Sequence, residues 1–504
     1  MSKFYVTTPI YYVNDSPHIG HSYTTIAADT LARHMRSVLG DANVRFLTGT
    51  DEHGQKAQAA GQAAQEFVDL VSVKFRNLWK KLGISHDDFI RTSEERHIRT
   101  VQRALDIVYK KGDIYKDTYE GWYCTPCETF WLVSQLAEGQ LCPDCKRPVE
   151  KISETNYFFK LNKYKDWLID HIKKNPDFIR PQIRRNEVLG FLREELNDLC
   201  ISRPKERLSW GIPLPFSPDH VTYVWFDALI NYISAVGHFD DKGAYISDWW
   251  GKDTNVVHLI GKDILRHHAV YWPIMLHSLG IKPPDTICAH GWWMIGADKM
   301  SKSRGNVVAP LDMIDKYGLD VYRYFLLREV PFGLDGNFSE EAVIRRLNSD
   351  LANDLGNLVY RTLTMIEKYY DGNIPAKELP VASCQLPVNE QEKKIRNKIN
   401  SLPDEIAAKF TAGSDFNFSA ALEEVWKLIN LANKYVEETK PWNLSKENKT
   451  KELERFILVL VDAIRAAGHA LKPFVPGTAG EILRQIGADQ IKKGKPLFPR
   501  IECS

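Results

Sequence analysis

The stretch FYVTTPIYYVNDSPHIGH, residues 4–21, decides the fold class of this chain. Its first part, residues 4–10, is apolar and rich in β-formers and predicts a strand, and the run NDSP at residues 14–17 predicts a turn. Apolar residues then recur at helical spacing over residues 24–39. A strand, a loop and a helix in this order form the first unit of an α/β domain.

Further strand and helix signals continue the α/β pattern. A second short strand at residues 44–47 runs into TGTDEHG, residues 48–54, which puts polar side chains at the C-terminal end of a strand. Ligands of open α/β sheets bind at that edge. We also predict strands at residues 221–226 and 256–260 and a helix at residues 269–279.

Length and composition are those of a globular protein with several domains. A chain of 504 residues corresponds to about three or four domains. Apolar residues make up 44% and charged residues 26%, so each domain can bury a core, and the net charge of +1 provides no overall attraction to nucleic acid or membrane. No apolar run reaches the roughly 18 residues of a membrane helix, and residues 4–13 lack the cleavage site of a signal peptide. We therefore expect a cytoplasmic chain.

Four of the eight cysteines are closely spaced. Cys124, Cys127, Cys142 and Cys145 follow the pattern Cys-x2-Cys-x14-Cys-x2-Cys, whose linker is one residue shorter than the roughly 15 to 20 usual for zinc. Each x2 turn directs two thiolates to one point, and Zn²⁺ takes four sulfurs in a tetrahedron. Because cysteine fills every ligand place, we expect one structural zinc ion per chain. Buried thiols or redox pairs are the alternative interpretation.

The cysteines lie in a segment that interrupts the α/β pattern. Residues 116–220 also contain a charged helical segment at 164–174, and we interpret the whole segment as an insertion. Past residue 340 only helical segments follow, interrupted at residues 372–375 and 380–387, at Pro441 and at Pro473. The predicted fold is α/β, a Rossmann-type parallel sheet split by a zinc-binding insertion and followed by an all-α helical bundle. The expected boundaries are 1–115 and 221–340 for the two halves of the sheet domain, 116–220 for the insertion and 341–504 for the bundle.

His18-Ile19-Gly20-His21 opens the first helix directly after the first strand. A helix N-terminus presents unpaired N–H groups and the positive end of the helix dipole to an anion. Gly20 lets a base or ribose approach the backbone, and the two imidazoles can donate hydrogen bonds to phosphoryl oxygens as charge develops in a transition state. By itself the motif is weak, because any His-x-Gly-His can start a helix with a histidine that is satisfied locally.

A second motif, KMSKSRGN at residues 299–306, lies in a polar segment before Val307 and Val308. Lys299 and Lys302 flank small hydroxyls and can form a mobile clamp that stabilises negative charge on a leaving pyrophosphate. A solvated basic loop is the simpler interpretation of this run alone. Both motifs, in this order on a split α/β sheet, favour the catalytic interpretation.

With these two signatures the chain resembles the class I aminoacyl-tRNA synthetases, and within them the methionyl-tRNA synthetase family of bacterial type. The resemblance covers essentially the whole length. It rests on TPIYY at 8–12, GTDEHG at 49–54, WGIP at 210–213, VWFDAL at 224–229, GKDI at 261–264, HGW at 290–292 and KPW at 440–442.

The resemblance implies an enzyme that joins L-methionine to ATP as methionyl-adenylate, releases pyrophosphate and transfers methionine to the 3′ end of tRNA(Met). Its partners are then ATP with Mg²⁺, L-methionine and tRNA(Met). The catalytic residues implied are His18, His21, Lys299 and Lys302, with Gly20, Asp263 and Ser301 also binding ATP. Asp263 has an alternative interpretation as an ordinary carboxylate at a strand end.

The resemblance also implies a methionine site. Asp51 is expected to pair with the ammonium group. Selection for a thioether must come from shape and from contacts of sulfur with aromatic rings, each of about 0.3 to 1.5 kcal/mol. The residues that match the family's pocket positions are Ile10, Tyr12, Trp225, Ala228, Leu229, Tyr232, Ile264, His268 and Trp272.

In the helical domain, Asn353, Asn357 and Arg361 fall on one stripe of a helix. Such a stripe can contact base edges and an exposed Trp442 can stack on a base, which suits a CAU anticodon. Without the resemblance the stripe is more typical of a solvated face, as are the lysine-rich runs at 446–451 and 492–495. The resemblance, and the end of the chain at Ser504, also favour a monomer.

Three other classes of protein share part of this pattern. Synthetases for leucine, isoleucine or valine carry an editing insertion too large for residues 116–220, and the cysteine enzyme is expected to use zinc at its amino-acid site. A zinc-knuckle protein that binds RNA without catalysis leaves both catalytic signatures unexplained. A nucleotidylyltransferase with only His-x-Gly-His has neither the helical domain nor the lysine clamp.

Overall fold

The computed structural model of the chain describes residues 3–13, 17–59, 64–124, 129–131, 133–143, 145–223, 225–295, 298–299, 308–375, 389–488 and 490–501. Among these residues no helix combines the length and the apolar character needed to cross a membrane.

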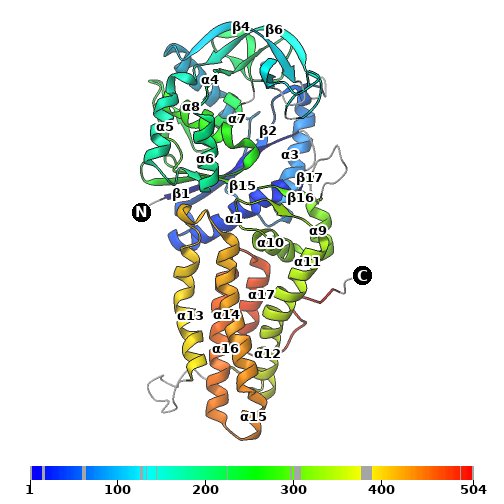
Figure 1. The fold of residues 1–504 in the computed structure, drawn as a ribbon. Helices are drawn as coiled ribbons and strands as arrows, with labels where there is room; N and C mark the ends of the chain where they lie inside the picture. Colours follow the sequence, from blue (N-terminus) through cyan, green and yellow to red (C-terminus); the bar gives the residue numbers. More distant parts are fainter. Residues whose placement is uncertain are drawn as a thin grey trace.

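A six-stranded parallel sheet forms the centre of the α/β part (Figure 1). The strand order β3-β2-β1-β14-β15-β7 places β14 and β15, from the second half of the chain, between strands from the first half, which confirms the expected split sheet. The strands are β1 (Lys3–Tyr12), β2 (Val44–Asp51), β3 (Asp88–Arg91), β7 (Ile179–Arg180), β14 (Thr254–Gly261) and β15 (Thr286–His290).

Side chains on alternate positions of these strands enter two apolar cores. On β1, Phe4 and Val6 face the core shared with α1 (Ile19–Leu39) and α3 (Ala64–Lys81), whereas Tyr5 faces the core shared with α4, α7 and α8. Burial on both faces explains the continuous apolar runs. Figure 1 shows α1 on the opposite side of the sheet from α4, α7 and α8. The three helices are α4 (Glu95–Lys110), α7 (Trp225–Ser234) and α8 (Trp272–Ser278), the last preceded by a π-helical turn, η6 (His267–Tyr271).

Apart from β7, the insertion consists mainly of antiparallel strands and two helices. Its largest sheet has the order β5-β4-β6-β8, in which Ile114 pairs with Phe159. A second sheet, β10-β11-β9, lies beside it in the sequence. The elements are β4 (Ile114–Cys124), β5 (Thr129–Trp131), β6 (Glu150–Phe159), α5 (Lys165–Lys174), α6 (Gln182–Phe191), β8 (Leu199–Cys200), β9 (Ser202–Pro204), β10 (Pro213–Leu214) and β11 (Ser217–Thr222).

Two local predictions differ from the structure. The strand expected at 221–226 ends at Thr222, belongs to an antiparallel sheet, and gives way at Trp225 to α7, because the apolar residues from Phe226 to Ile233 are spaced for a helix. The range 116–220, expected to lie outside the main sheet, contains β7, which pairs in parallel with β15. A two-residue strand has too little pattern to be recognised in a sequence.

Short strands and one short helix connect these parts. They are α2 (Gln55–Gln58), β12 (Gly237–Phe239), β13 (Tyr245–Ser247), β16 (Trp293–Ile295), β17 (Asp298–Lys299) and β18 (Gly336–Asn337).

The C-terminal part is helical and extends away from the sheet as a bundle (Figure 1). The helix breaks expected at two prolines are present, since Pro441 begins a new helix after Lys440 and Pro473 follows the end of another. The helices are α9 (Pro310–Tyr317), α10 (Leu319–Arg328), α11 (Glu340–Arg346), the π-helical η8 (Leu347–Gly356), α12 (Asn357–Tyr370), α13 (Glu390–Ala407), α14 (Phe418–Thr439), α15 (Pro441–Lys446), α16 (Thr450–Leu471) and α17 (Pro476–Ile486).

A buried ion pair lies where the sheet domain meets the bundle. Arg323 Nη2 of α10 lies 2.7 Å from Asp29 Oδ2 of α1, and both side chains have no exposed surface. Arg323 Nε donates to the carbonyl oxygen of Phe474, directly beyond α16, and the Ser85 N–H donates to Asp29 Oδ1. Burial raises the pKa of Asp29, but Arg323 and Arg33 together lower it below its usual value.

We predict that Arg323→Met lowers the free energy of unfolding by about 3 to 5 kcal/mol, because it leaves a buried carboxylate and buried carbonyls without their donor. Chemical denaturation at neutral pH measures this loss. The difference between variant and wild type should shrink as the pH falls through the folded-state pKa of Asp29, since the stabilisation by a carboxylate with a lowered pKa is lost on protonation.

The matched control is Arg33→Met, which removes the other guanidinium on Asp29. Arg33 is partly exposed, so its loss is expected to cost about 1 kcal/mol or less. Equal stability of the two variants would contradict the role of Arg323.

Candidate active site

A cavity of about 330 Å³ opens at the C-terminal ends of β1, β2 and β14, between the start of α1 and the start of α7. This is the sheet edge at which the sequence places its polar motifs. Thirteen of the residues expected to bind ATP or methionine line it: Ile10, Tyr12, His18, Gly20, His21, Asp51, Trp225, Ala228, Leu229, Tyr232, Asp263, Ile264 and His268.

Trp272 does not line this cavity, although a direct contact with methionine was expected. Its side chain is fully buried one layer further in, with its ring centroid 5.8 Å from that of Tyr232. Its Nε1–H donates to His258 Nε2 at 3.2 Å. Trp272 therefore supports Tyr232 from behind, because the helix that carries it turns this position toward the core.

The two histidines of the first motif cap α1. His18 Nδ1 accepts a hydrogen bond from the Gly20 N–H (3.1 Å), and His21 Nδ1 accepts one from the His18 N–H (3.2 Å). The two imidazoles thus form a reciprocal capping box, with ring centroids 3.8 Å apart. Because Nδ1 is the acceptor in both rings, each neutral imidazole carries its proton on Nε2 as a donor.

Two glycines lie against rings that line the cavity. A Cβ on Gly20 would lie 3.0 Å from His18 Cε1, so the capping ring would have to shift by a few tenths of an ångström. Gly54 has a φ of +136°, which L-residues rarely adopt, and a Cβ there would lie 2.5 Å from Tyr12 Oη. Both glycines keep cavity-lining rings in place.

Asp51 lies at the end of β2 with its side chain at the cavity wall and is 9% exposed. The next residue, Glu52, points away from the cavity into a buried network that the sequence analysis did not identify. Its Oε1 accepts from Arg91 Nε at 2.7 Å, and its Oε2 accepts from Ser93 Oγ at 2.5 Å. These bonds fix the backbone that carries Asp51.

The apolar end of the cavity is closed by hydrogen-bonded aromatic side chains. Tyr232 Oη lies 2.7 Å from His268 Nε2, and His268 Nδ1 donates to the carbonyl of Ile264. Burial lowers the pKa of His268 to about 4, so the ring is neutral at physiological pH and Tyr232 is the donor. Trp225 stacks on His267 with ring centroids 3.5 Å apart. The wall combines aromatic faces with neutral polar groups and suits a weakly polar side chain.

His290, Gly291 and Trp292 also line the cavity and were missed as site residues. His290 Nε2 lies 2.6 Å from Thr24 Oγ1 of α1, and burial lowers the pKa of His290. Trp292 Nε1 donates to Asp263 Oδ1 at 3.4 Å. The sequence could have indicated these residues, because they follow the apolar run that forms β15, and ligands bind at the C-terminal ends of such strands.

Of the second motif, residues 299–306, the structure describes only Lys299. Lys299 lies in β17, where it pairs with Met294 of β16, next to the cavity residue Trp293. Ser301 and Lys302 fall outside the described residues.

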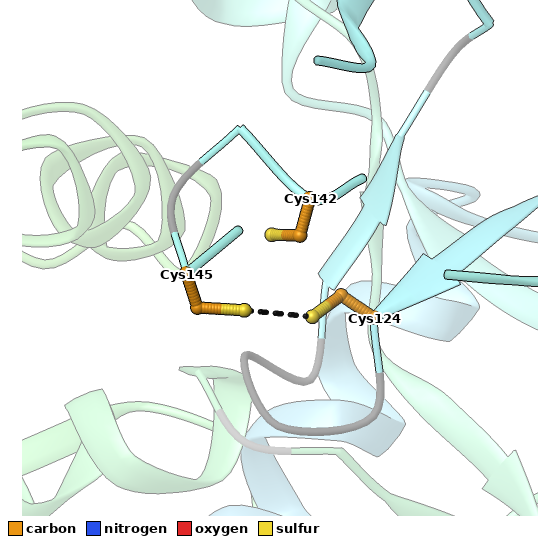
Figure 2. A group of neighbouring side chains, drawn as sticks. All are labelled: Cys124, Cys142 and Cys145. Carbon is orange, nitrogen blue, oxygen red and sulfur yellow. Dashed lines mark hydrogen bonds between the residues drawn. The ribbon is translucent and has the colours of Figure 1, made fainter. Parts of the chain in front are cut away.

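Three of the four clustered cysteines converge (Figure 2). The sulfurs of Cys124, Cys142 and Cys145 lie within 4.8 Å of one another, and Cys124 Sγ is 3.4 Å from Cys145 Sγ. Thiolates bound to one zinc ion through bonds of about 2.3 Å lie about 3.8 Å apart, so this spacing suits a shared metal ion. Cys127 falls outside the described residues. The cluster could therefore hold a metal ion.

The stripe expected to contact an anticodon spans two kinds of helix. Asn353 lies in the π-helical η8, whereas Asn357 and Arg361 lie in α12, and Asn357 is exposed. Asn353 Oδ1 accepts a hydrogen bond from Arg500 Nη2, a contact that the sequence did not predict. Trp442 of α15 is 43% exposed, and α12 and α15 both pack on α16.

Comparison with known proteins gives consistent results. The sequence profile of the family described as "tRNA synthetases class I (M)" matches residues 4–152 and 147–363. The methionine–tRNA ligase of Caldanaerobacter subterraneus subsp. tengcongensis is 47% identical over 99% of this chain and 79% of its own length, and that of Bacillus subtilis is 42% identical over 100% and 78%. The structure of Mycobacterium tuberculosis methionyl-tRNA synthetase in complex with methionyl-adenylate superposes with a TM-score of 0.89 at 39% identity, over 99% of this chain and 100% of that chain.

Proposed function

The chain belongs to the methionyl-tRNA synthetase family of class I tRNA synthetases, and on that premise we propose how its cavity activates methionine with ATP and how the chain transfers methionine to tRNA(Met). The observation that carries the proposal is the single cavity in which the capped start of α1, the carboxylate of Asp51 and an aromatic wall meet. Each of these parts suits a different portion of methionyl-adenylate.

In the first step a carboxylate oxygen of methionine bonds to the α-phosphorus of ATP while the bond to the pyrophosphate oxygen breaks. The reaction needs positioning and stabilisation of charge, and no protein nucleophile. His18 and His21 donate from Nε2 to phosphoryl oxygens, and the N-terminus of α1 adds its dipole. Asp263 binds the ribose, and Gly20 leaves room for the nucleoside.

The lysines of the second motif act on the leaving group. Lys299 and Lys302 stabilise the negative charge that moves to pyrophosphate, and Ser301 contributes a hydroxyl donor. Mg²⁺ bound with ATP supplies further neutralisation of the phosphates. In the second step the terminal ribose hydroxyl of the tRNA attacks the adenylate carbonyl and AMP leaves.

The cavity selects methionine through its ammonium group and its thioether. Asp51 pairs with the ammonium group, while Tyr12, Trp225, Tyr232 and His268 surround the thioether with aromatic faces. The neutral state of His268 supports this role, because a charged imidazolium would favour a polar side chain over a thioether.

We propose that the cysteine cluster binds one structural Zn²⁺ through Cys124, Cys127, Cys142 and Cys145. The support is the thiolate donor set and the close approach of three sulfurs. The ion would hold the end of β4 together with the loop that carries Cys142 and Cys145.

We further propose that residues 1–115 and 221–340 form the catalytic unit and residues 341–504 the tRNA-binding unit. Asn353, Asn357, Arg361 and Trp442 would contact the anticodon, supported by the exposure of Asn357 and Trp442. Because charged tRNA is used in protein synthesis, we expect the enzyme in the cytoplasm. A monomeric state stays a prediction.

The test of the activity is amino-acid-dependent exchange between pyrophosphate and ATP, measured with each standard amino acid. We expect exchange with methionine and with no other standard amino acid at comparable efficiency. Norleucine and homocysteine should react with reduced efficiency, because a changed or missing methylene-sized group is worth about 1 to 3 kcal/mol. Preferential exchange with isoleucine or leucine would contradict the proposal.

Metal analysis tests the second proposal. We expect about one zinc ion per chain in protein purified without chelator, and its loss in Cys124→Ser and Cys145→Ser. Cys288→Ser is the matched control, because Cys288 is a buried cysteine of β15 outside the cluster and should leave the zinc content unchanged. A fully active wild-type protein without metal would contradict the site.

The tRNA proposal is tested by Trp442→Ala. Stacking of a base on an aromatic ring is worth about 1 to 3 kcal/mol, so charging of tRNA(Met) should fall about tenfold to a hundredfold. Exchange without tRNA should be unchanged, because the cavity lies in the other domain. Loss of exchange would show that Trp442 has a structural role, and unchanged charging would show that the anticodon is contacted elsewhere.

A further inference from the structure

Two histidines and an aspartate form a buried cluster outside the cavity. Asp227 Oδ2 lies 2.6 Å from His53 Nδ1, and Asp227 Oδ1 lies 2.7 Å from His97 Nε2. His97 Nδ1 in turn lies 2.9 Å from Ser234 Oγ. The carboxylate therefore accepts from both imidazoles, one on each oxygen.

The cluster is deeply buried. The side chains of His97 and Asp227 are 0% and 1% exposed and that of His53 is 9% exposed. Burial raises the pKa of Asp227, but His53 and His97 lower it to about 2, so the carboxylate is ionised at physiological pH. Burying such a charge is costly unless its hydrogen bonds are well made, and removal of one partner is correspondingly disruptive.

The cluster connects α4 to two elements that line the cavity, the end of β2 and the start of α7. His53 follows Asp51 by two residues, directly after β2, and Asp227 lies in the first turn of α7 between Trp225 and Ala228. Trp225, Ala228 and Asp51 line the cavity, whereas none of the three cluster residues does. His97 comes from α4, which packs along α7.

The carboxylate of Asp227 thus connects the strand end that carries Asp51 to the helix that carries part of the thioether wall. The distance between these two parts determines the length of amino acid that fits between the ammonium partner and the aromatic pocket. If only a loop connected the end of β2 to α7, the distance between them could vary. Two short charge-assisted hydrogen bonds to Asp227 restrict this distance.

We propose that His53, Asp227 and His97 are positioning residues that hold Asp51 at the correct distance from the Trp225 side of the pocket and so set the selectivity for the length of the amino-acid side chain. The inference rests on the proposed methionine activation. It assigns these residues no contact with methionine or ATP.

Asp227→Asn is the first test, because the amide has nearly the same shape but one oxygen becomes an N–H₂ donor. That donor would face an imidazole N–H, so one of the two hydrogen bonds is lost without a change in volume. In the pyrophosphate exchange assay we expect the KM for methionine to rise about tenfold to a hundredfold, the effect of a displacement of about 1 Å in a positioning group. The KM for ATP should change by less than about twofold to threefold, because the α1 start is not connected to the cluster.

The second readout is selectivity. The ratio of kcat/KM for methionine to that for norleucine or homocysteine should fall in Asp227→Asn, since a looser distance discriminates less well between lengths. His97→Gln should change the same quantities less, because the His53 bond remains. His238→Gln is the matched control, because His238 is an exposed histidine of β12 and should behave as wild type.

The results separate the possible outcomes. A lower melting temperature with an unchanged KM for methionine and unchanged selectivity would overturn the inference and leave a purely structural role. If Asp227→Asn fails to fold, His97→Gln decides between a positioning role and a purely structural role. The measurement is again the ratio of kcat/KM for methionine to that for norleucine or homocysteine. A wild-type chain without methionine-dependent exchange would instead contradict the proposed function itself.

Discussion

The buried contact between Asp29 and Arg323 is the interaction on which both halves of the molecule depend. Asp29 lies on α1, the helix whose first turn holds His18 and His21, and Arg323 also binds the carbonyl oxygen of Phe474 next to the bundle. A guanidinium without exposed surface needs several acceptors, and here they come from both domains. The position of the catalytic helix is therefore determined by the same contacts that attach the helical bundle.

This arrangement gives two parts of α1 different functions. Its N-terminus provides donors to the cavity, and its middle packs into an apolar core that continues without interruption from the sheet into the bundle. A tRNA bound at the bundle would thus act on a structure that is continuous with the adenylation site. The activity without tRNA uses the cavity and not the exposed surface of the bundle, so changes at these two places are expected to be separable.

The thioether pocket depends on keeping its imidazoles neutral. Burial lowers the pKa values of His258, His267 and His268, so imidazoles surround the thioether pocket without placing a charge there. Each ring is held by a specific partner, such as Thr7 for His258 and Tyr232 for His268. Shape and aromatic contacts can then decide which amino acid is bound, while the buried charge of Asp227 is enclosed by its own two histidines.

The sequence by itself determined the local features: the strand and helix around His18, the spacing of the cysteines, and the helix breaks at Pro441 and Pro473. Periodicity and turn residues act within a few positions, so they can be recognised without a structure. Only the tertiary structure decided that Trp272 lies behind the cavity, that β7 joins the main sheet and that Trp225 begins a helix. It also decided two contacts between distant residues. Asp29 meets Arg323 across 294 positions of the sequence, and His53 meets Asp227 across 174. Such contacts depend on how separate elements pack, and packing between distant segments leaves no periodic trace in the chain.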